Sequence, residues 1–201
     1  FDISNCTVRG KVQGGISLGT TAAYTSVGGL IGLGNQINSM SNCHNYSTVI
    51  GGYPTSPCYQ SYTGGLIGYA YDPDFTISNC TNNGPVNAGT ALQNAKTGGL
   101  AGALISYKNM TDCHNYADIT GGSVTDNRNN YRPWQYIGGL CGDDDDGTMY
   151  NCSNSGKITS GAMAVITGLY ASPNSTVRIG GLSGDCGAHV SQCTNTGDIV
   201  V

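Results

Sequence analysis

The chain of 201 residues has no glutamate and few charges of any kind, since only 10% of its positions are Asp, Lys or Arg. It also contains 32 glycines. Glutamate, lysine and arginine favour helices and glycine disfavours them, so the sequence leaves little from which stable helices could form. Val, Ile, Thr and Tyr instead occupy short runs between clusters of Gly, Asn and Ser, which is typical of strands and turns. We therefore expect an all-β fold.

Positive charge and long apolar segments are also scarce. The eight Lys and Arg residues are scattered singly and the formal net charge is −4, so the chain offers no basic stripe for phosphates. No apolar run approaches the roughly 18 residues that a membrane-spanning helix requires. We expect neither nucleic-acid binding nor membrane insertion of this segment.

What the chain does contain is a repeat. A ten-residue pattern, apolar-x-x-Cys-x-Asn-x-Gly-x-apolar, recurs with local departures around Cys6, Cys43, Cys80, Cys113, Cys152 and Cys193. Between its copies lies a Gly-Gly-Leu-x-Gly pentapeptide, which begins at Gly28, Gly64, Gly98, Gly138 and Gly180. Self-similarity at such a period indicates a stacked or radial repeat fold.

The repeat predicts a right-handed parallel β-solenoid with about three short strands in each coil. One strand would pass through Gly-Gly-Leu, one through the Cys, and one through the Val or Ile that ends the ten-residue pattern. Equivalent residues of successive coils would lie about 4.8 Å apart and form ladders, with the Cys and Leu positions facing the core. A propeller is the alternative architecture, but it requires blade signatures such as Trp-Asp, and the chain has one Trp.

The two motifs together resemble the GLUG repeat of bacterial surface proteins. The resemblance covers essentially the whole chain, with departures such as Ser47 and Ala117 in place of Gly and Val8 in place of the first Asn. It implies the scaffold of a large, secreted or surface-attached, adhesin-like protein, and hence an extracellular location on a bacterial cell. We interpret residues 1–201 as one solenoid domain within a longer surface protein, with a half repeat at 1–14 and repeats that begin near 28, 64, 98, 138 and 180.

The cysteines allow two interpretations. Nine cysteines in an extracellular chain suggest disulfides, but the parallel side chains of a ladder do not readily meet the disulfide dihedral. We interpret the six repeated cysteines as free, buried, small apolar residues. Cys141 and Cys186 break the pattern in neighbouring coils and leave a bridge open, and Cys58 is interpreted as an exposed thiol in a loop.

Cys-His-Asn-Tyr occurs twice, at residues 43–46 and 113–116, and raises the question of a thiol protease. Adjacent residues of a strand face opposite ways, so each Cys would point inward and its His outward, beyond the reach that a nucleophile and its base need. Zinc shared by His44 and His114 is also disfavoured, because an intervening coil would separate them by roughly 9–10 Å. With no opposed pair of carboxyl groups recognisable, we expect no enzyme activity.

The densest charge gives a candidate calcium site. Its carboxylates belong to Asp143, Asp144, Asp145 and Asp146, which follow the fourth glycine motif, and to Asp72 and Asp74 of an earlier coil. Stacking would bring some of them into one strip, and oxygen-only ligation of that kind suits calcium. A solvated turn is the favoured interpretation, because consecutive Asp residues cannot all face one ion. We expect no other cofactor.

Aromatic side chains in the variable loops before the glycine motifs are the predicted contact surface. The candidates are Tyr59, Tyr62, Tyr131, Arg132, Trp134 and Tyr136. Tyrosine and tryptophan tolerate water at one end, so rings stacked along one edge suit a protein surface or a sugar ring. The alternative is that these rings pack across the coil edge and cover the loops.

The leading functional hypothesis is a non-enzymatic, adhesin-like domain that contacts a host or matrix protein or glycan through these loops. The second is a carbohydrate-binding or glycan-processing surface module, and the third is a passive spacer. Because the ends of a solenoid leave strand edges unpaired, we also expect either neighbouring repeats or end-to-end self-association.

Overall fold

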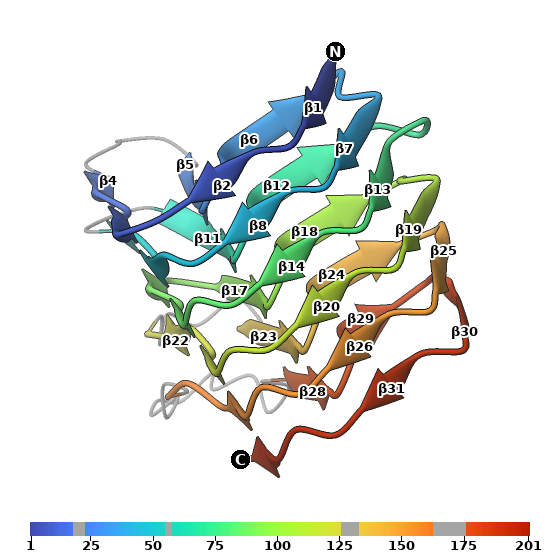
Figure 1. Cartoon of the computed structure of the whole chain (residues 1–201). Coiled ribbons are helices and arrows are strands. Elements are labelled where there is room, and N and C mark those ends of the chain that lie inside the picture. The colour runs from blue at the N-terminus through green and yellow to red at the C-terminus, as the bar shows by residue number, and fades with distance from the viewer. Residues whose placement is uncertain (18–22, 55–57, 126–132, 163–175) are drawn as a thin grey trace.

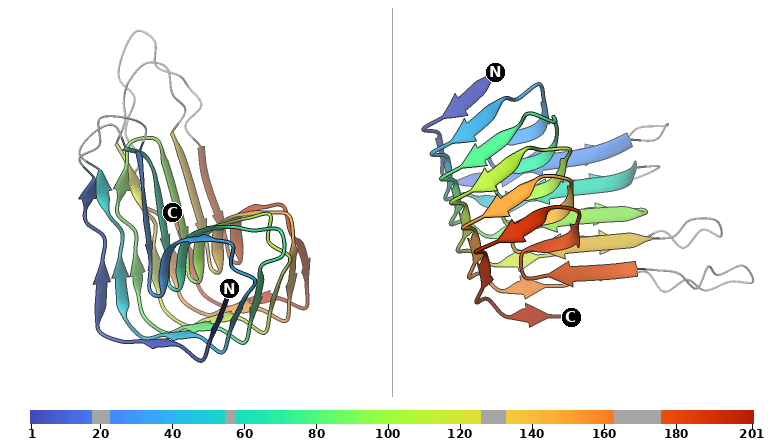
Figure 2. Two further views of the ribbon diagram at one scale, coloured as in Figure 1. Left: turned by 90° about the horizontal axis from the view of Figure 1, so that it is seen from above. Right: turned by 90° about the vertical axis from the view of Figure 1, so that its right-hand side faces the viewer.

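The computed structural model describes residues 1–17, 23–54, 58–125, 133–162 and 176–201. Within these ranges every regular element is a strand, and the strands pair in parallel from coil to coil. The two termini lie at opposite ends of the resulting stack (Figure 1). Seen from the N-terminal end, the chain runs clockwise as it recedes, which makes the coil right-handed (Figure 2). The predicted β-solenoid is thus confirmed.

Three six-stranded sheets contain the cysteine motif, and each takes one strand from every coil. The pre-cysteine sheet consists of β1 (Asp2–Ser4), β7 (Ser39–Ser41), β13 (Thr76–Ser78), β19 (Asn109–Thr111), β25 (Thr148–Tyr150) and β30 (His189–Ser191). The post-cysteine sheet consists of β2 (Thr7–Val8), β8 (His44–Asn45), β14 (Thr81–Asn82), β20 (His114–Asn115), β26 (Ser153–Asn154) and β31 (Thr194–Asn195). The valine sheet consists of β3 (Lys11–Gln13), β9 (Thr48–Ile50), β15 (Val86–Asn87), β21 (Ile119–Thr120), β27 (Ile158–Thr159) and β32 (Ile199–Val200).

Two five-stranded sheets meet at the glycine motif. The pre-glycine sheet consists of β5 (Ala23–Gly28), β11 (Cys58–Gly64), β17 (Asn94–Gly98), β23 (Trp134–Gly138) and β28 (Thr176–Gly180). The post-glycine sheet consists of β6 (Ile31–Asn35), β12 (Ile67–Tyr71), β18 (Ala101–Ile105), β24 (Cys141–Asp145) and β29 (Ser183–Cys186). Two short pairs complete the fold, β4 (Ile16–Ser17) with β10 (Tyr53–Pro54) and β16 (Thr90–Ala91) with β22 (Ser123–Val124).

Bends divide the predicted strands into these shorter pieces. Between residues 58 and 87, for example, the glycine strand becomes β11 and β12, and the cysteine strand becomes β13 and β14. The second bend falls on the residue before each Cys, which is left-handed with φ between 49° and 55° at Asn5, Asn42, Asn79, Asp112, Asn151 and Gln192. Asn and Asp adopt this conformation more readily than most residues. The repeat has a second recurring Asn, two residues after the Cys, whose residue type would suit a bend equally well.

That second Asn has a different role, because its side chain points into the core. Asn45, Asn82 and Asn115 are fully buried, and the amide nitrogen of each donates to the amide oxygen of the equivalent Asn one coil further on, at 2.6–2.7 Å. The same nitrogen also donates to the carbonyl oxygen two residues later, as Asn82 does to Gly84 at 2.9 Å. A buried amide must find partners, and this ladder satisfies it from coil to coil.

The glycine motif makes room for the amide ladder. A Cβ on Gly65 would lie 2.1 Å from the carbonyl oxygen of Gly99 and 2.5 Å from the side chain of Asn82. Both distances are far below a van der Waals contact, so only glycine allows the backbone to approach the ladder this closely.

In cross-section each coil is L-shaped, and the two glycine sheets line the concave corner between its two arms (Figure 2). One arm encloses the larger core, which includes Leu66, Leu100 and Leu140 together with the Met and Cys ladders. The other arm encloses a smaller core in which Ile137 of the pre-glycine sheet packs with Val86, Ile119 and Ile158 of the valine sheet. The concave corner between the two arms lies on the outside of the coil.

The cysteine ladder lies inside the larger core as predicted. Cys43, Cys80 and Cys113 are fully buried, and in all six copies the thiol lies 3.1–3.4 Å from the carbonyl oxygen two residues earlier. All cysteines whose side chains the structure describes are free. Burial raises the pKa of the Cys43 thiol to about 11, so it stays protonated at neutral pH.

Candidate ligand-contact site

The corner between the glycine sheets brings together two fixed positions of the repeat. The residue two places before each glycine motif forms a column of Ser26, Tyr62, Lys96, Tyr136 and Arg178. The residue directly after the motif forms a facing column of Leu33, Tyr69, Ala103, Asp143 and Asp185. We name the four residues Tyr62, Lys96, Tyr136 and Arg178 the corner ladder.

Rings and cations alternate along the corner ladder. The Lys96 ammonium nitrogen lies 5.4 Å from the centroid of the Tyr62 ring and 6.0 Å from that of the Tyr136 ring. The Arg178 guanidinium carbon lies 5.2 Å from the Tyr136 centroid. These separations are typical of cation–π contacts. Each cation is therefore held against at least one aromatic neighbour from the adjacent coil.

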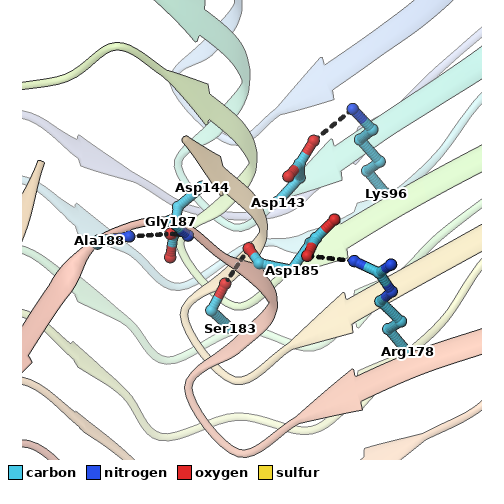
Figure 3. A network of polar contacts seen from close by, with 8 residues as sticks. All are labelled: Lys96, Asp143, Asp144, Arg178, Ser183, Asp185, Gly187 and Ala188. Atoms are coloured by element: carbon cyan, nitrogen blue, oxygen red, sulfur yellow. Dashed lines mark hydrogen bonds and ion pairs between the residues drawn. The ribbon is translucent and has the colours of Figure 1, made fainter. Parts of the chain in front are cut away.

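The facing column neutralises both cations (Figure 3). Lys96 pairs with Asp143 at 2.5 Å, and these side chains are only 16% and 14% exposed. Arg178 pairs with Asp185 in a more open position, where the side chains are 49% and 37% exposed. An exposed ion pair contributes little because water and salt screen it, whereas a desolvated pair leaves an uncompensated charge if one partner is removed. The Lys96 pair is thus the structurally important one.

Two of the predicted contact residues are buried by this packing. Tyr62 and Tyr136 lie in strands β11 and β23 and are 7% and 5% exposed, so neither is part of an open loop. Tyr62 also contacts the Tyr69 ring across the corner, with centroids 4.9 Å apart. Burial raises the pKa of both Tyr62 and Tyr136, and their phenols stay protonated.

Accessible aromatic surface remains at the rim of the corner. Trp134 is 39% exposed, and its ring stacks on that of Tyr136 with centroids 5.9 Å apart and planes inclined by 23°. Tyr24 is 51% exposed and meets Tyr62 edge-on at 6.0 Å. Because each ring rests on the corner ladder, Trp134 presents a braced aromatic face to solvent. Tyr131 and Arg132 lie outside the described residues, as does the side chain of Tyr59.

The predicted calcium carboxylates are not gathered into one cage. The side chains of Asp143 and Asp144 point to different sides of β24, and Asp72 and Asp74 lie two coils away, past the coil of β18. In the described part of the chain no three His, Cys or Asp side chains form a group that could hold a metal ion. Asp72 instead accepts the backbone N–H of Asp74 at 3.1 Å.

Asp144 is turned into the fold and has a structural role. Its carboxylate accepts the backbone N–H groups of Gly187 and Ala188 at 2.9 and 3.0 Å (Figure 3). Only 2% of the residue is exposed, and burial raises the pKa of its carboxyl group despite these hydrogen bonds. It therefore braces the turn after β29 rather than facing solvent with Asp145 and Asp146.

The register of β24 and β29 shows where Cys141 and Cys186 lie relative to each other. Cys141 pairs in register with Ser183, and Cys186 pairs with Asp144, so the two thiols are offset and both are free. Cys141 is fully buried, which raises its pKa well above the ordinary value. Cys186 is exposed. The side chain of Cys58 is outside the described residues.

The repeated Cys-His-Asn-Tyr segments also lie as expected. Cys43 and Cys113 point into the core, while His44 and His114 lie on the outer face. Each imidazole contacts a hydroxyl of the next coil through Nδ1, His44 with Thr81 at 2.9 Å and His114 with Ser153 at 2.8 Å. In both segments the thiol and the imidazole therefore lie on opposite sides of the chain.

Sequence reasoning missed three participants in the corner: Tyr69, Lys96 and Arg178. A signal for them exists, because every member of the two columns stands at a constant offset from its glycine motif. Aligning the repeats on Gly-Gly-Leu-x-Gly would have found the columns. That they face each other follows only from the bend between the sheets.

These features define a repeat scaffold, a parallel β-solenoid whose coils are built from alternating glycine and cysteine motifs. The family model described as the GLUG motif matches residues 59–87, from β11 to β15. The resemblance seen in the sequence is therefore confirmed, and the chain carries the GLUG motif. Neither the curated proteins nor the solved structures contain a significant match. The described ranges hold no helix with the length and apolarity needed to cross a membrane.

Proposed function

We propose that this chain is a non-enzymatic, adhesin-like repeat domain displayed on a bacterial surface, which contacts a host or matrix protein at the rim of the corner. The observation that carries the proposal is the braced exposure of Trp134 on Tyr136. Exposed aromatic rings on a rigid support are the residues that dominate binding energies at interfaces, because little conformational entropy is lost when they are covered.

A carbohydrate-binding or glycan-processing surface module is the second candidate. The same observation supports it, since a flat indole held at a fixed angle suits the apolar face of a sugar ring. A passive spacer is the third, and it would need no contact surface at all.

A paired binding screen separates the three. The purified chain is applied to a glycan array and to immobilised host and matrix proteins, alongside Trp134→Ala and Tyr71→Ala. Tyr71 is 52% exposed on the post-glycine sheet and serves as a matched control. Protein binding lost only in Trp134→Ala supports the adhesin, and glycan binding lost only in that variant supports the second candidate. Binding that Trp134→Ala leaves unchanged, or silence on both arrays, contradicts a contact at the rim.

A further inference from the structure

A second tyrosine column runs along the outer face that is foremost in Figure 1, beside the post-cysteine sheet. It consists of the residue three places after each Cys, and its first four members are Arg9, Tyr46, Asn83 and Tyr116, which we name the front ladder. Backbone hydrogen bonds place them in successive coils: Tyr46 N–H donates to Val8 at 2.9 Å and Tyr116 N–H to Asn82 at 2.8 Å. All four are exposed, Tyr46 by 46% and Tyr116 by 53%.

Arg9 shows how the Tyr46 ring is oriented. Its guanidinium carbon lies 4.6 Å from the centroid of the Tyr46 ring, above one ring face. Since Arg9 and Tyr46 occupy equivalent positions in adjacent coils, that face is turned toward the first coil. The opposite face is turned toward the next coil, where the equivalent residue is the short Asn83. The Asn83 amide is occupied on its own coil, because its nitrogen donates to the Thr81 hydroxyl at 2.8 Å.

Tyr46 and Tyr116 are two coils apart, which corresponds to roughly 9.6 Å between equivalent atoms. The corner ladder has the same arrangement, since Tyr62 and Tyr136 are also two coils apart and Lys96 of the intervening coil places its ammonium group between their rings. A cation midway between Tyr46 and Tyr116 would lie about 4.8 Å from each ring, within the range of a cation–π contact. At this midpoint the front ladder has Asn83 where the corner ladder has a lysine.

We propose that the gap between Tyr46 and Tyr116 binds a lysine or arginine side chain of a partner protein, which takes the place that Lys96 fills in the corner. The surrounding charge favours such a ligand. The chain carries a net charge of −4, and the exposed Asp118 lies two residues after Tyr116, in the bend between β20 and β21. Lys157 is the equivalent residue of the following coil, and it contacts Asp118 through its backbone N–H at 2.9 Å. Complementary charge promotes encounter with a basic surface.

This site is separate from the rim of the corner, and the inference does not rest on the proposed function. The probe is acetyl-arginine amide, with the neutral isostere acetyl-citrulline amide as its control, and the readout is the movement of tyrosine ring signals in NMR titrations. We expect saturable shifts of Tyr46 and Tyr116 with the arginine probe and none with citrulline. Tyr46→Leu or Tyr116→Leu should weaken binding by about two- to fivefold, the factor that one exposed cation–π contact contributes.

Substitution of the middle residue gives the sharpest control. Asn83→Lys fills the gap from within and should abolish the probe-induced shifts, while the neutral Asn83→Gln should retain them. Tyr71→Ala and Trp134→Ala should leave the shifts unchanged, which separates a failure here from a failure at the rim. Equal shifts with citrulline, displacement of the probe by a neutral oligosaccharide, or undiminished binding to Asn83→Lys would each overturn the proposal.

Discussion

The corner ladder and the front ladder place tyrosines at the same two-coil spacing, yet one is packed away and the other is open. In the corner, Tyr62 and Tyr136 are less than a tenth exposed because the post-glycine sheet lies opposite. On the front face Tyr46 and Tyr116 have no sheet of the described residues packed on them, and about half of each residue is exposed. Between its two tyrosines the corner has a cation, Lys96, whereas the front has Asn83 at that position and its cation, Arg9, on the other side of Tyr46.

The difference teaches that residue type and spacing do not decide whether an aromatic ladder is structural. What decides it is the surface that lies opposite. A facing strand can provide Asp143 as a counter-ion and Tyr69 as a packing partner, and the ladder then becomes part of the stable fold. Without a facing strand the tyrosines stay about half exposed, and Tyr46 is covered by Arg9 on one ring face only.

The largest expected loss of stability comes from removing the ion pair between Lys96 and Asp143 in the corner. Lys96→Met leaves Asp143 largely desolvated and without its partner, so we expect a loss of about 2 kcal/mol in the free energy of unfolding. Urea denaturation measures it. The double variant Lys96→Met with Asp143→Asn should recover most of the loss. Equal stability of the single variant and the native chain would show that the corner is no more structural than the front.

The carboxyl group next to Asp143 gives a pH-dependent effect. Burial raises the pKa of Asp144 above its unfolded value near 3.8, so the stability contributed by its neutral form is complete below that pH and is lost as the pH rises through the folded-state pKa. Asp144→Asn cannot ionise and can still accept the two backbone N–H groups. It should be more stable than the native chain at pH 7 and show no gain at pH 3. Urea midpoints at both pH values test this, and a gain that is the same at both would refute it.

Transplanting the corner pattern to the front should produce a smaller gain. Asn83→Lys places an ammonium group between Tyr46 and Tyr116 as Lys96 stands between its two rings. An exposed cation–π contact contributes about 0.5 kcal/mol, so we expect a gain of that order relative to Asn83→Gln. Thermal unfolding of the two variants measures the difference. A lysine less stable than the glutamine would indicate that the front rings do not face the gap.

The smallest effect is expected at the open end of the corner. Arg178→Met removes a cation that is half exposed and paired with an exposed Asp185, so the loss should stay below about 0.5 kcal/mol and shrink further in high salt. Urea unfolding at low and high salt provides the measurement. A loss as large as that of Lys96→Met would mean that exposure does not distinguish the two ion pairs.

Much of the fold could be predicted from the repeat itself. The inward Cys ladder, the outward His44 and His114 and the parallel stacking all follow from strand alternation and constant register. The left-handed residue could not be placed, because Asn occurs both before and after the Cys and both positions fit a bend. The inward turn of Asp144 was also hidden, since four consecutive Asp residues give no alternation to read.

The candidate site was predictable only in part. Trp134 was identified and is exposed, but Tyr62 and Tyr136 were grouped with it because they precede a glycine motif, and the structure buries both. Lys96 and Asp143 are 47 residues apart, and nothing in their local sequence links them. Their pairing depends on the angle at which the glycine motif turns one sheet against the next.

The sequence by itself determined the ladders of this protein. A strict offset from each Cys or glycine motif assigns every residue to a column, and parallel stacking then places that column along the coil axis about 4.8 Å per step. Only the tertiary structure decided which columns face each other. The bend at Gly-Gly-Leu sets the two glycine sheets at an angle, so that tyrosines and charged side chains in the corner between them are packed and desolvated. The front column stays exposed to solvent.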